Sequence, residues 1–320
     1  MTKIAYLIGA GASARTLPVV QGMADAGMEL LARLNDMPTQ SLGSSKPSVQ
    51  NCKNVIGEII ALCKSSASID THAKILSDSR EFAALEDLKQ KLVLYFSLLE
   101  VAGGVDNRYE NFFAGISHYG VMPQNMSILS WNYDLQIETA MSRFLKSSSF
   151  VDIRKSLGFV DFSNASSFAP NEFNLVKLNG SACFHIHTGN EHATPIPLNV
   201  SDQNQGLIDV CMNYYKLKDI HQATNLRFAW EDTSKEFMSV LIEKLERVHT
   251  LVVIGYSFPS FNRSIDKRIL AKLNPFKVIL QYPKLTGAEL FVREVLKGNS
   301  KLEVVPDNDV EQFHIPFDFF

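Results

Sequence analysis

Short apolar runs, each followed by small or polar residues, alternate along the chain with longer segments whose apolar residues have a helical spacing. The predicted strands are 4–8, 126–131, 173–178, 250–255, 276–281 and 301–305. Strands that are apolar throughout are typical of parallel sheets that carry helices on both faces. The pattern therefore predicts an α/β fold with a Rossmann-like, doubly wound and mostly parallel sheet.

The longest helical tract separates the first two predicted strands. It predicts a large helical insertion, about 19–120, within a single domain that spans residues 1–320. Residues 42–48 are rich in Ser, Gly and Pro and are expected to form a surface loop, and Ser79 is expected to cap a helix at 80–100. Other helices are predicted at 21–35, 135–145, 230–249, 263–273 and 287–296.

The periodicity is lost between residues 182 and 230, where Pro, Gly and Asn are frequent. This segment is predicted to be a loop-rich region with a short hairpin. We expect it to cover the ends of the strands rather than to form a second domain.

Composition narrows the classes of function. The chain has 320 residues, of which 46% are hydrophobic and 20% charged, as in an ordinary globular protein, and its formal net charge is −3. Direct nucleic-acid binding is not expected, because no overall basic field exists. No segment approaches the roughly 18 apolar residues of a membrane helix, and the first residues lead directly into a strand, so no membrane association and a cytoplasmic location are expected. The four scattered cysteines are expected to be free thiols.

The loop after the first strand is rich in glycine. The residues concerned are Gly9, Ala10, Gly11, Ala12 and Ser13. They fit the start of a dinucleotide-binding fingerprint, in which glycines let a phosphate approach the main chain. The fingerprint also requires a second strand that ends in an acidic residue about 20 residues later. Asp25 and Glu29 instead fall on a predicted helix, so a hydride-transferring dehydrogenase is not expected.

Three further predicted strands also end in polar residues. The candidates are Ser130, Asn132 and Asp134 after the second strand, Asn179 and Gly180 after the third, and Gly255, Tyr256 and Ser257 after the fourth. Because the carboxyl ends of parallel strands share one edge of a sheet, we expect these loops to meet the glycine loop there. Asn132 and Asp134 have a second interpretation as caps of the helix that follows them.

In this order the segments GAGAS, SWNYD, KLNGS and GYSFP resemble the NAD-binding segments of the sirtuin-type (SIR2-like) family. The resemblance covers the chain from about residue 3 to 273 and is greatest to the SIR2-like proteins of bacterial antiphage defence. It implies that residues 9–13 contact the NAD phosphates, that Asn132 and Asp134 lie beside the nicotinamide ribose, and that residues 255–257 lie near the adenosine.

The resemblance also implies an activity and partners. Many bacterial relatives cleave NAD into nicotinamide and ADP-ribose and so deplete it. They commonly work with a partner such as a HerA-type ATPase, an Argonaute-like protein or another sensor, and often as oligomers. The zinc ribbon of the family's deacylases needs paired cysteines, which this chain lacks, so neither a metal nor deacylation is expected.

Asn179 stands where the family has its catalytic histidine. An amide cannot act as a general base near pH 7, whereas an imidazole can. Two hypotheses follow: an NAD glycohydrolase that orients its substrate without this base, or a catalytically impaired subunit that binds NAD or ADP-ribose. His185 and His187 are candidate substitutes for the base, although a role as ordinary hairpin residues is favoured, and a metal site that includes His192 has less support still.

Overall fold

A seven-stranded sheet forms the centre of the computed structural model, which describes residues 2–38, 42–185, 192–197, 202–220, 223–283 and 287–317. The strands lie in the order β3-β4-β2-β1-β7-β8-β9, and all neighbouring pairs are parallel. They are β1 (Ile4–Ile8), β2 (Met126–Ser130), β3 (Phe159–Val160), β4 (Asn174–Lys177), β7 (Thr250–Ile254), β8 (Lys277–Gln281) and β9 (Glu303–Asp307). The prediction of a Rossmann-like α/β sheet is confirmed.

β1 occupies the middle of the sheet because it is apolar on both faces. Ile4, Tyr6 and Ile8 pack on one face, and Ala5 and Leu7 pack on the other. This alternation is the two-residue period of a strand, so each face contributes to a separate core. From β1 the chain adds β2 on one side, then the edge strand β3, and then β4 between β3 and β2. It then continues on the other side of β1 through β7, β8 and β9.

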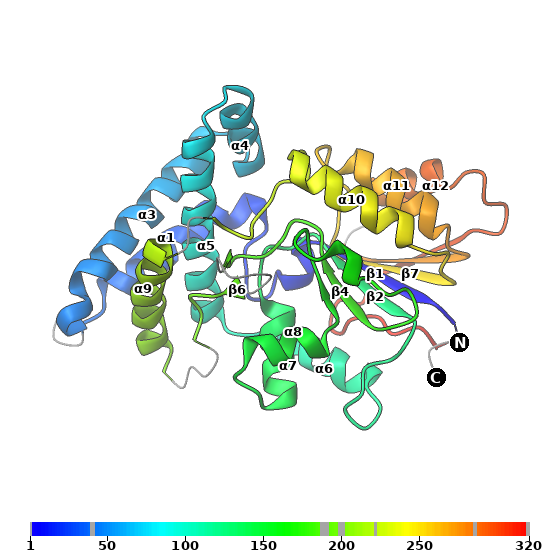
Figure 1. Cartoon of the computed structure of the whole chain (residues 1–320), viewed down its shortest axis with the longest axis horizontal. Helices are drawn as coiled ribbons and strands as arrows, with labels where there is room; N and C mark the ends of the chain where they lie inside the picture. Colours follow the sequence, from blue (N-terminus) through cyan, green and yellow to red (C-terminus); the bar gives the residue numbers. More distant parts are fainter. Residues whose placement is uncertain are drawn as a thin grey trace.

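Helices cover both faces of this sheet (Figure 1). One face packs against α10 (Asp232–Lys244), α11 (Arg263–Leu273) and α12 (Ala288–Val295). The other packs against α6 (Asn107–Ile116), α7 (Gln136–Leu145) and α8 (Phe150–Ser156). The sheet is thus the middle layer of three.

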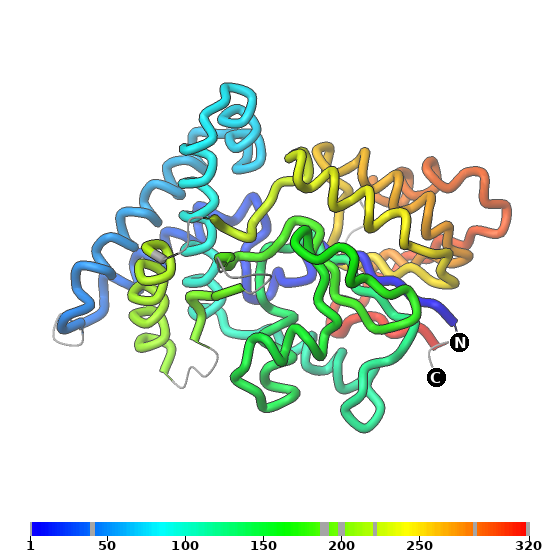
Figure 2. Tube along the Cα trace, viewed as in Figure 1, coloured from blue at the N-terminus to red at the C-terminus, as the bar shows by residue number. Residues whose placement is uncertain are grey.

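A further group of helices lies beyond the carboxyl ends of the strands and has its own apolar core (Figure 1). We call it the helical layer. It consists of α1 (Met23–Asn35), α3 (Lys46–Ser65), α4 (Ile69–Asp78), α5 (Phe82–Gly103) and α9 (Gln203–Ile220). Four of these helices separate β1 from β2 in the sequence, whereas α9 comes from much later and packs beside α5 and α3 (Figure 2).

Two local predictions within the tract between β1 and β2 are wrong. The segment 42–48 is not a loop, because a 3-10 turn at Gly43–Ser45 leads directly into α3, whose second residue is Pro47. Proline is well tolerated in a first helical turn, where its missing N–H costs no hydrogen bond. Ser79 does not cap α5 but ends α4, and α5 begins three residues later after Arg80, which has a positive φ of 60°.

The region 182–230 is also less loop-rich than expected. The predicted hairpin exists as β5 (Phe184–His185) and β6 (His192–Ala193). The 18-residue helix α9 was not predicted, and neither was the short edge strand β3. α9 packs into the helical layer through Leu207, Cys211 and Tyr214, which lie on one face at helical spacing.

The four cysteines are free, as predicted. Among the described residues, no helix has the length and apolar character needed to cross a membrane.

Candidate functional site

The four predicted loops meet at the carboxyl edge of the sheet, where the strands end. Their strands β4, β2, β1 and β7 are consecutive in the sheet. β1 and β7 are the pair at which the direction of sheet building reverses, and ligands of open α/β sheets bind beside such a switch point. The edge faces the helical layer, so the loops lie between the sheet and that layer (Figure 1).

The loops after β1 and β7 touch through their main chains. The N–H of Gly11 donates to the carbonyl oxygen of Gly255 at 2.9 Å, and Gly255 has a φ of +59°. A Cβ atom on Gly255 would lie 2.3 Å from the main chain of Gly11 and Ala12, and one on Gly11 would lie 2.8 Å from Gly255. The glycines at these positions are therefore required by close packing of the two loops.

The glycine loop (residues 9–13) ends in a tight turn rather than in a long helix. Residues Ala10–Ser13 form a 3-10 helix, and α1 begins only at Met23. Besides the bond from Gly11, the N–H of Ala12 donates to the oxygen of Gly9 at 2.9 Å. These two N–H groups are used within the protein, so any phosphate at this loop must contact other groups, such as those of exposed Ala10.

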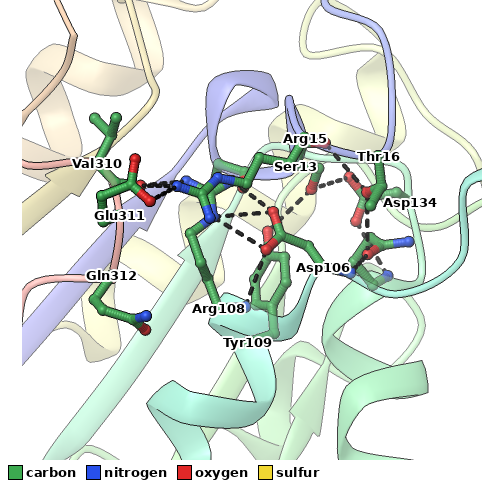
Figure 3. A network of polar contacts seen from close by, with 12 residues as sticks. Ser13, Arg15, Thr16, Asp106, Arg108, Tyr109, Asp134, Val310, Glu311 and Gln312 are labelled. Carbon is green, nitrogen blue, oxygen red and sulfur yellow. Dashed lines mark hydrogen bonds and ion pairs between the residues drawn. The ribbon is translucent and has the colours of Figure 1, made fainter.

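Ser13 connects the glycine loop to the loop after β2 (Figure 3). Its hydroxyl lies 2.9 Å from Oδ2 of Asp134 and 3.0 Å from the hydroxyl of Tyr109, and Nδ2 of Asn132 lies 3.4 Å away. Oδ1 of Asp134 accepts a hydrogen bond from the N–H of Gln136 at 3.2 Å. Both oxygens of Asp134 are thus engaged, and the geometry gives this residue a role in positioning Ser13 and the start of α7.

A buried ion pair supports the same loop from α6 (Figure 3). The guanidinium of Arg108 contacts the carboxylate of Asp106 at 2.5 Å and donates to the carbonyl oxygen of Ala12 at 2.7 Å. It also donates to the oxygen of Val310, in the segment after β9. Arg108 therefore joins the glycine loop to a part of the chain that is distant in sequence.

Lys177, at the end of β4, is fully buried and holds the loop after β2. Its ammonium group donates to the carbonyl oxygens of Asp134 at 2.5 Å and Asn132 at 3.4 Å, and lies 3.5 Å from a carboxylate oxygen of Glu138. Burial raises the pKa of Asp134, and burial with the nearby Asp134 charge raises the pKa of Glu100, which accepts the N–H of Leu135. The loop that carries Asn132 thus rests on a buried layer of ionisable groups.

Asn179 lies in this edge with one polar atom unused. Its side-chain Nδ2 lies 3.4 Å from the carbonyl oxygen of Trp131, and its main-chain carbonyl oxygen accepts a hydrogen bond from the N–H of Arg227 at 2.8 Å. The residue is 6% exposed, and its buried Oδ1 has no hydrogen-bond partner among the described residues. A buried amide oxygen without a partner is costly, so a donor from a ligand or water is expected there.

Of the remaining predicted residues, Ser130 is buried, and its hydroxyl accepts the N–H of Asn132 at 3.2 Å. Ser257 is exposed, and it precedes Phe258, which is fully buried with a positive φ of 55°. A bulky residue in this conformation is strained, and such strain is found preferentially at functional sites. Gly180 is buried and packs against Asn225.

The candidate histidines form a separate cluster above β3. His192 Nε2 lies 3.1 Å from Oδ2 of Asp161, and Asn225 Nδ2 lies within 3.4 Å of both His185 and His192. Burial lowers the pKa of His185 to about 4, so this imidazole is neutral near pH 7. Among the residues that the structure describes, no group of His, Cys, Asp or Glu could hold a metal ion. His187 lies outside the described residues.

Sequence reasoning missed the residues that support the loops, chiefly Lys177, Tyr109 and Arg108. A lysine within the apolar run that becomes β4 was a signal for the first of them. Tyr109 and Arg108 lie on a helix in which neither residue type is unusual. No known protein-family model matches this sequence, and no curated protein matches it.

Proposed function

We propose that this chain binds NAD at the carboxyl edge of the sheet and hydrolyses the bond between nicotinamide and ribose. The observation that carries the proposal is Oδ1 of Asn179, which is buried at the end of β4, beside the loop after β2, and has no hydrogen-bond partner among the described residues. A ribose hydroxyl or the carboxamide of nicotinamide offers the N–H or O–H donor that this oxygen lacks. The resemblance of the four loops to SIR2-like segments supports the same ligand.

In the proposed reaction the bond between C1′ of the ribose and the nicotinamide nitrogen breaks. Nicotinamide leaves with the bonding electrons, water adds to C1′, and one proton is released to solvent. The transition state resembles an oxocarbenium ion, by analogy with other glycoside chemistry. Orientation and electrostatic stabilisation supply the catalysis, because the amides of Asn132 and Asn179 can orient ribose and water but cannot accept a proton.

A second candidate function is binding of NAD or ADP-ribose without hydrolysis, as a subunit of a larger assembly. Two observations favour it: Asn179 offers no base, and both oxygens of Asp134 are engaged within the protein. Action in antiphage defence, as an oligomer and with a HerA-type ATPase, an Argonaute-like protein or another sensor as partner, rests on the resemblance alone.

Calorimetry with NAD and ADP-ribose, together with chromatography of released nicotinamide, separates the two functions. Hydrolysis predicts nicotinamide release that Asn132→Ala abolishes, while Asn51→Ala, an exposed site on α3, leaves it unchanged. Binding without release supports the second function. If neither NAD nor ADP-ribose binds, both functions are wrong.

Asn179→Ala tests the observation on which the proposal depends. Removal of the amide takes away the unpartnered oxygen, so we expect weaker NAD binding and no gain of activity. Asn179→His restores an imidazole at the position of the family's base. An increase in nicotinamide release in this variant would show that the site holds NAD in the productive orientation.

A further inference from the structure

A buried carboxyl group joins two of the loops at the carboxyl edge. Asp266 lies in the first turn of α11 and is 0% exposed. Its Oδ1 accepts a hydrogen bond from Nε1 of Trp131 at 3.1 Å, and its Oδ2 accepts one from the hydroxyl of Tyr256 at 2.9 Å. Trp131 immediately precedes Asn132, and Tyr256 lies between Gly255 and Ser257, so one side chain holds the loops after β2 and β7.

The two rings held by Asp266 extend this contact to the glycine loop. Trp131 and Tyr256 stack with their centroids 6.1 Å apart and an interplanar angle of 16°. A Cβ atom on Gly9 would lie 2.5 Å from Cδ2 of Tyr256, so the tyrosine ring packs directly against the start of the glycine loop. The carboxyl group is therefore linked, directly or through Trp131 and Tyr256, to three of the four loops of the candidate site.

The surroundings of Asp266 make its presence costly for stability. Among the described residues it forms no ion pair, and burial raises its pKa to about 7. The titratable or charged groups that face it are Tyr256, Tyr282 after β8, and Arg263 on its own helix, whose Nε donates to the oxygen of Phe258. A buried carboxyl without a cation is usually less stable than an apolar residue of similar size. Its two hydrogen bonds fix the positions of Trp131 and Tyr256, which an apolar residue could not do.

We propose that Asp266 is a positioning residue, which holds Trp131 and Tyr256, and with them the loops after β2 and β7, in the arrangement that binds NAD. The proposal rests on the NAD site proposed above. Asp266 does not touch the ligand, and it acts through the two aromatic residues.

Calorimetric titration of the full chain with NAD tests the effect on binding. Asp266→Ala leaves both donors without an acceptor, and we expect it to weaken NAD binding at least tenfold. Tyr256→Phe and Trp131→Phe each remove one donor and fold as conservative replacements, so each is expected to weaken binding less than Asp266→Ala does. Asp219→Asn, an exposed carboxyl on α9, is the matched control and is expected to bind as the unaltered chain does. Affinities within twofold for all of these variants would overturn the proposal.

A spectroscopic titration tests the contact without any ligand. The chain has two tryptophans, so in a Trp230→Phe background the fluorescence reports on Trp131 alone. We expect this fluorescence to change with pH around a midpoint near 7, and the change to vanish in Asp266→Asn. A change that persists in Asp266→Asn would mean that another group titrates beside Trp131, and the proposal would be wrong.

Hydrogen exchange separates a failure of this proposal from a failure of the proposed function. If the unaltered chain binds no NAD, the function is wrong, and amide protection of residues 131–134 and 255–258 then decides whether Asp266 positions the loops. Loss of protection in both segments of Asp266→Ala supports positioning. Unchanged protection in both segments overturns it.

Discussion

Replacement of Asp266 by asparagine should change how the stability of the protein depends on pH. Burial raises the pKa of Asp266 from its ordinary value of 3.8 to about 7. The folded chain therefore holds this proton more tightly than the unfolded chain does. The contribution of such a group to the free energy of unfolding is complete below about pH 4 and is lost as the pH rises through about 7.

The magnitude follows from the interval between the two pKa values of Asp266. A difference of one pH unit in pKa corresponds to about 1.4 kcal/mol, and the range from pH 5 to pH 8 covers about two thirds of the interval. The unaltered chain should lose about 2 to 3 kcal/mol of stability over this range through Asp266. Asparagine mimics the protonated carboxyl and does not titrate. Its Nδ2 cannot accept the O–H of Tyr256, which costs about 1 kcal/mol at every pH.

Urea denaturation at pH 5 and pH 8 measures this effect as a difference between the two proteins. At pH 5 Asp266→Asn should be close to the unaltered chain in stability, and at pH 8 it should be the more stable. Other buried acids such as Glu100 and Asp134 titrate in both proteins and cancel in the comparison. Asp219→Asn controls for the general effect of removing one acid. If the difference between Asp266→Asn and the unaltered chain varies by less than about 0.5 kcal/mol between the two pH values, the reasoning is refuted.

Three other predictions concern the loops and the groups beneath them. Gly255→Ala should destabilise the fold by about 3 kcal/mol in urea denaturation, because its Cβ would lie 2.3 Å from the glycine loop. The control Gly57→Ala, which has open space around it on α3, should stabilise the fold by about 1 kcal/mol. Equal effects of the two substitutions would contradict the packing argument. Lys177→Met removes the nearer cation of buried Glu138, at 3.5 Å, and among the described residues leaves only Arg154, at 3.7 Å. It should cost about 3 to 5 kcal/mol, of which the double variant with Glu138→Gln recovers part. Strictly additive losses would argue against coupling of Lys177 and Glu138. His185→Asn should leave the pH profile of nicotinamide release unchanged between pH 6 and 8, since the pKa of His185 is about 4. A displaced pH profile would identify His185 as the base.

The centre of the sheet could be predicted because its strands are buried on both faces. β1, β2, β4 and β7 are short runs of apolar residues whose ends are marked by glycine, asparagine or serine. β3 has only two residues and gives no comparable signal. The buried residues Leu207, Cys211 and Tyr214 give α9 a helical spacing of its own, but the helix starts with polar residues from Gln203 and carries Gly206 in its first turn, and the spacing was missed.

The convergence of the site loops could also be predicted, since it follows from a parallel sheet. The supporting groups could not, because tertiary packing alone brings them together. Asp266 lies in the segment RSIDKR, in which charged residues are expected to face solvent, yet it is fully buried against residues that precede it by 135 and 10 positions. Its partners Trp131 and Tyr256 are aromatic residues at the ends of apolar strands, and nothing in such a position indicates a shared carboxyl partner.

The same geometry separates the residues that the fold requires from those that a ligand requires. Gly11 and Gly255 are needed wherever these two loops touch, with or without a phosphate. Ser13, Ser130 and Asp134 find their hydrogen-bond partners within the protein. A glycine-rich turn after a strand is therefore weak evidence for a nucleotide by itself. Among the residues that the structure describes, none donates to Oδ1 of Asn179, so the strongest test of an NAD site is made at Asn179 rather than at the glycine loop that first suggested it.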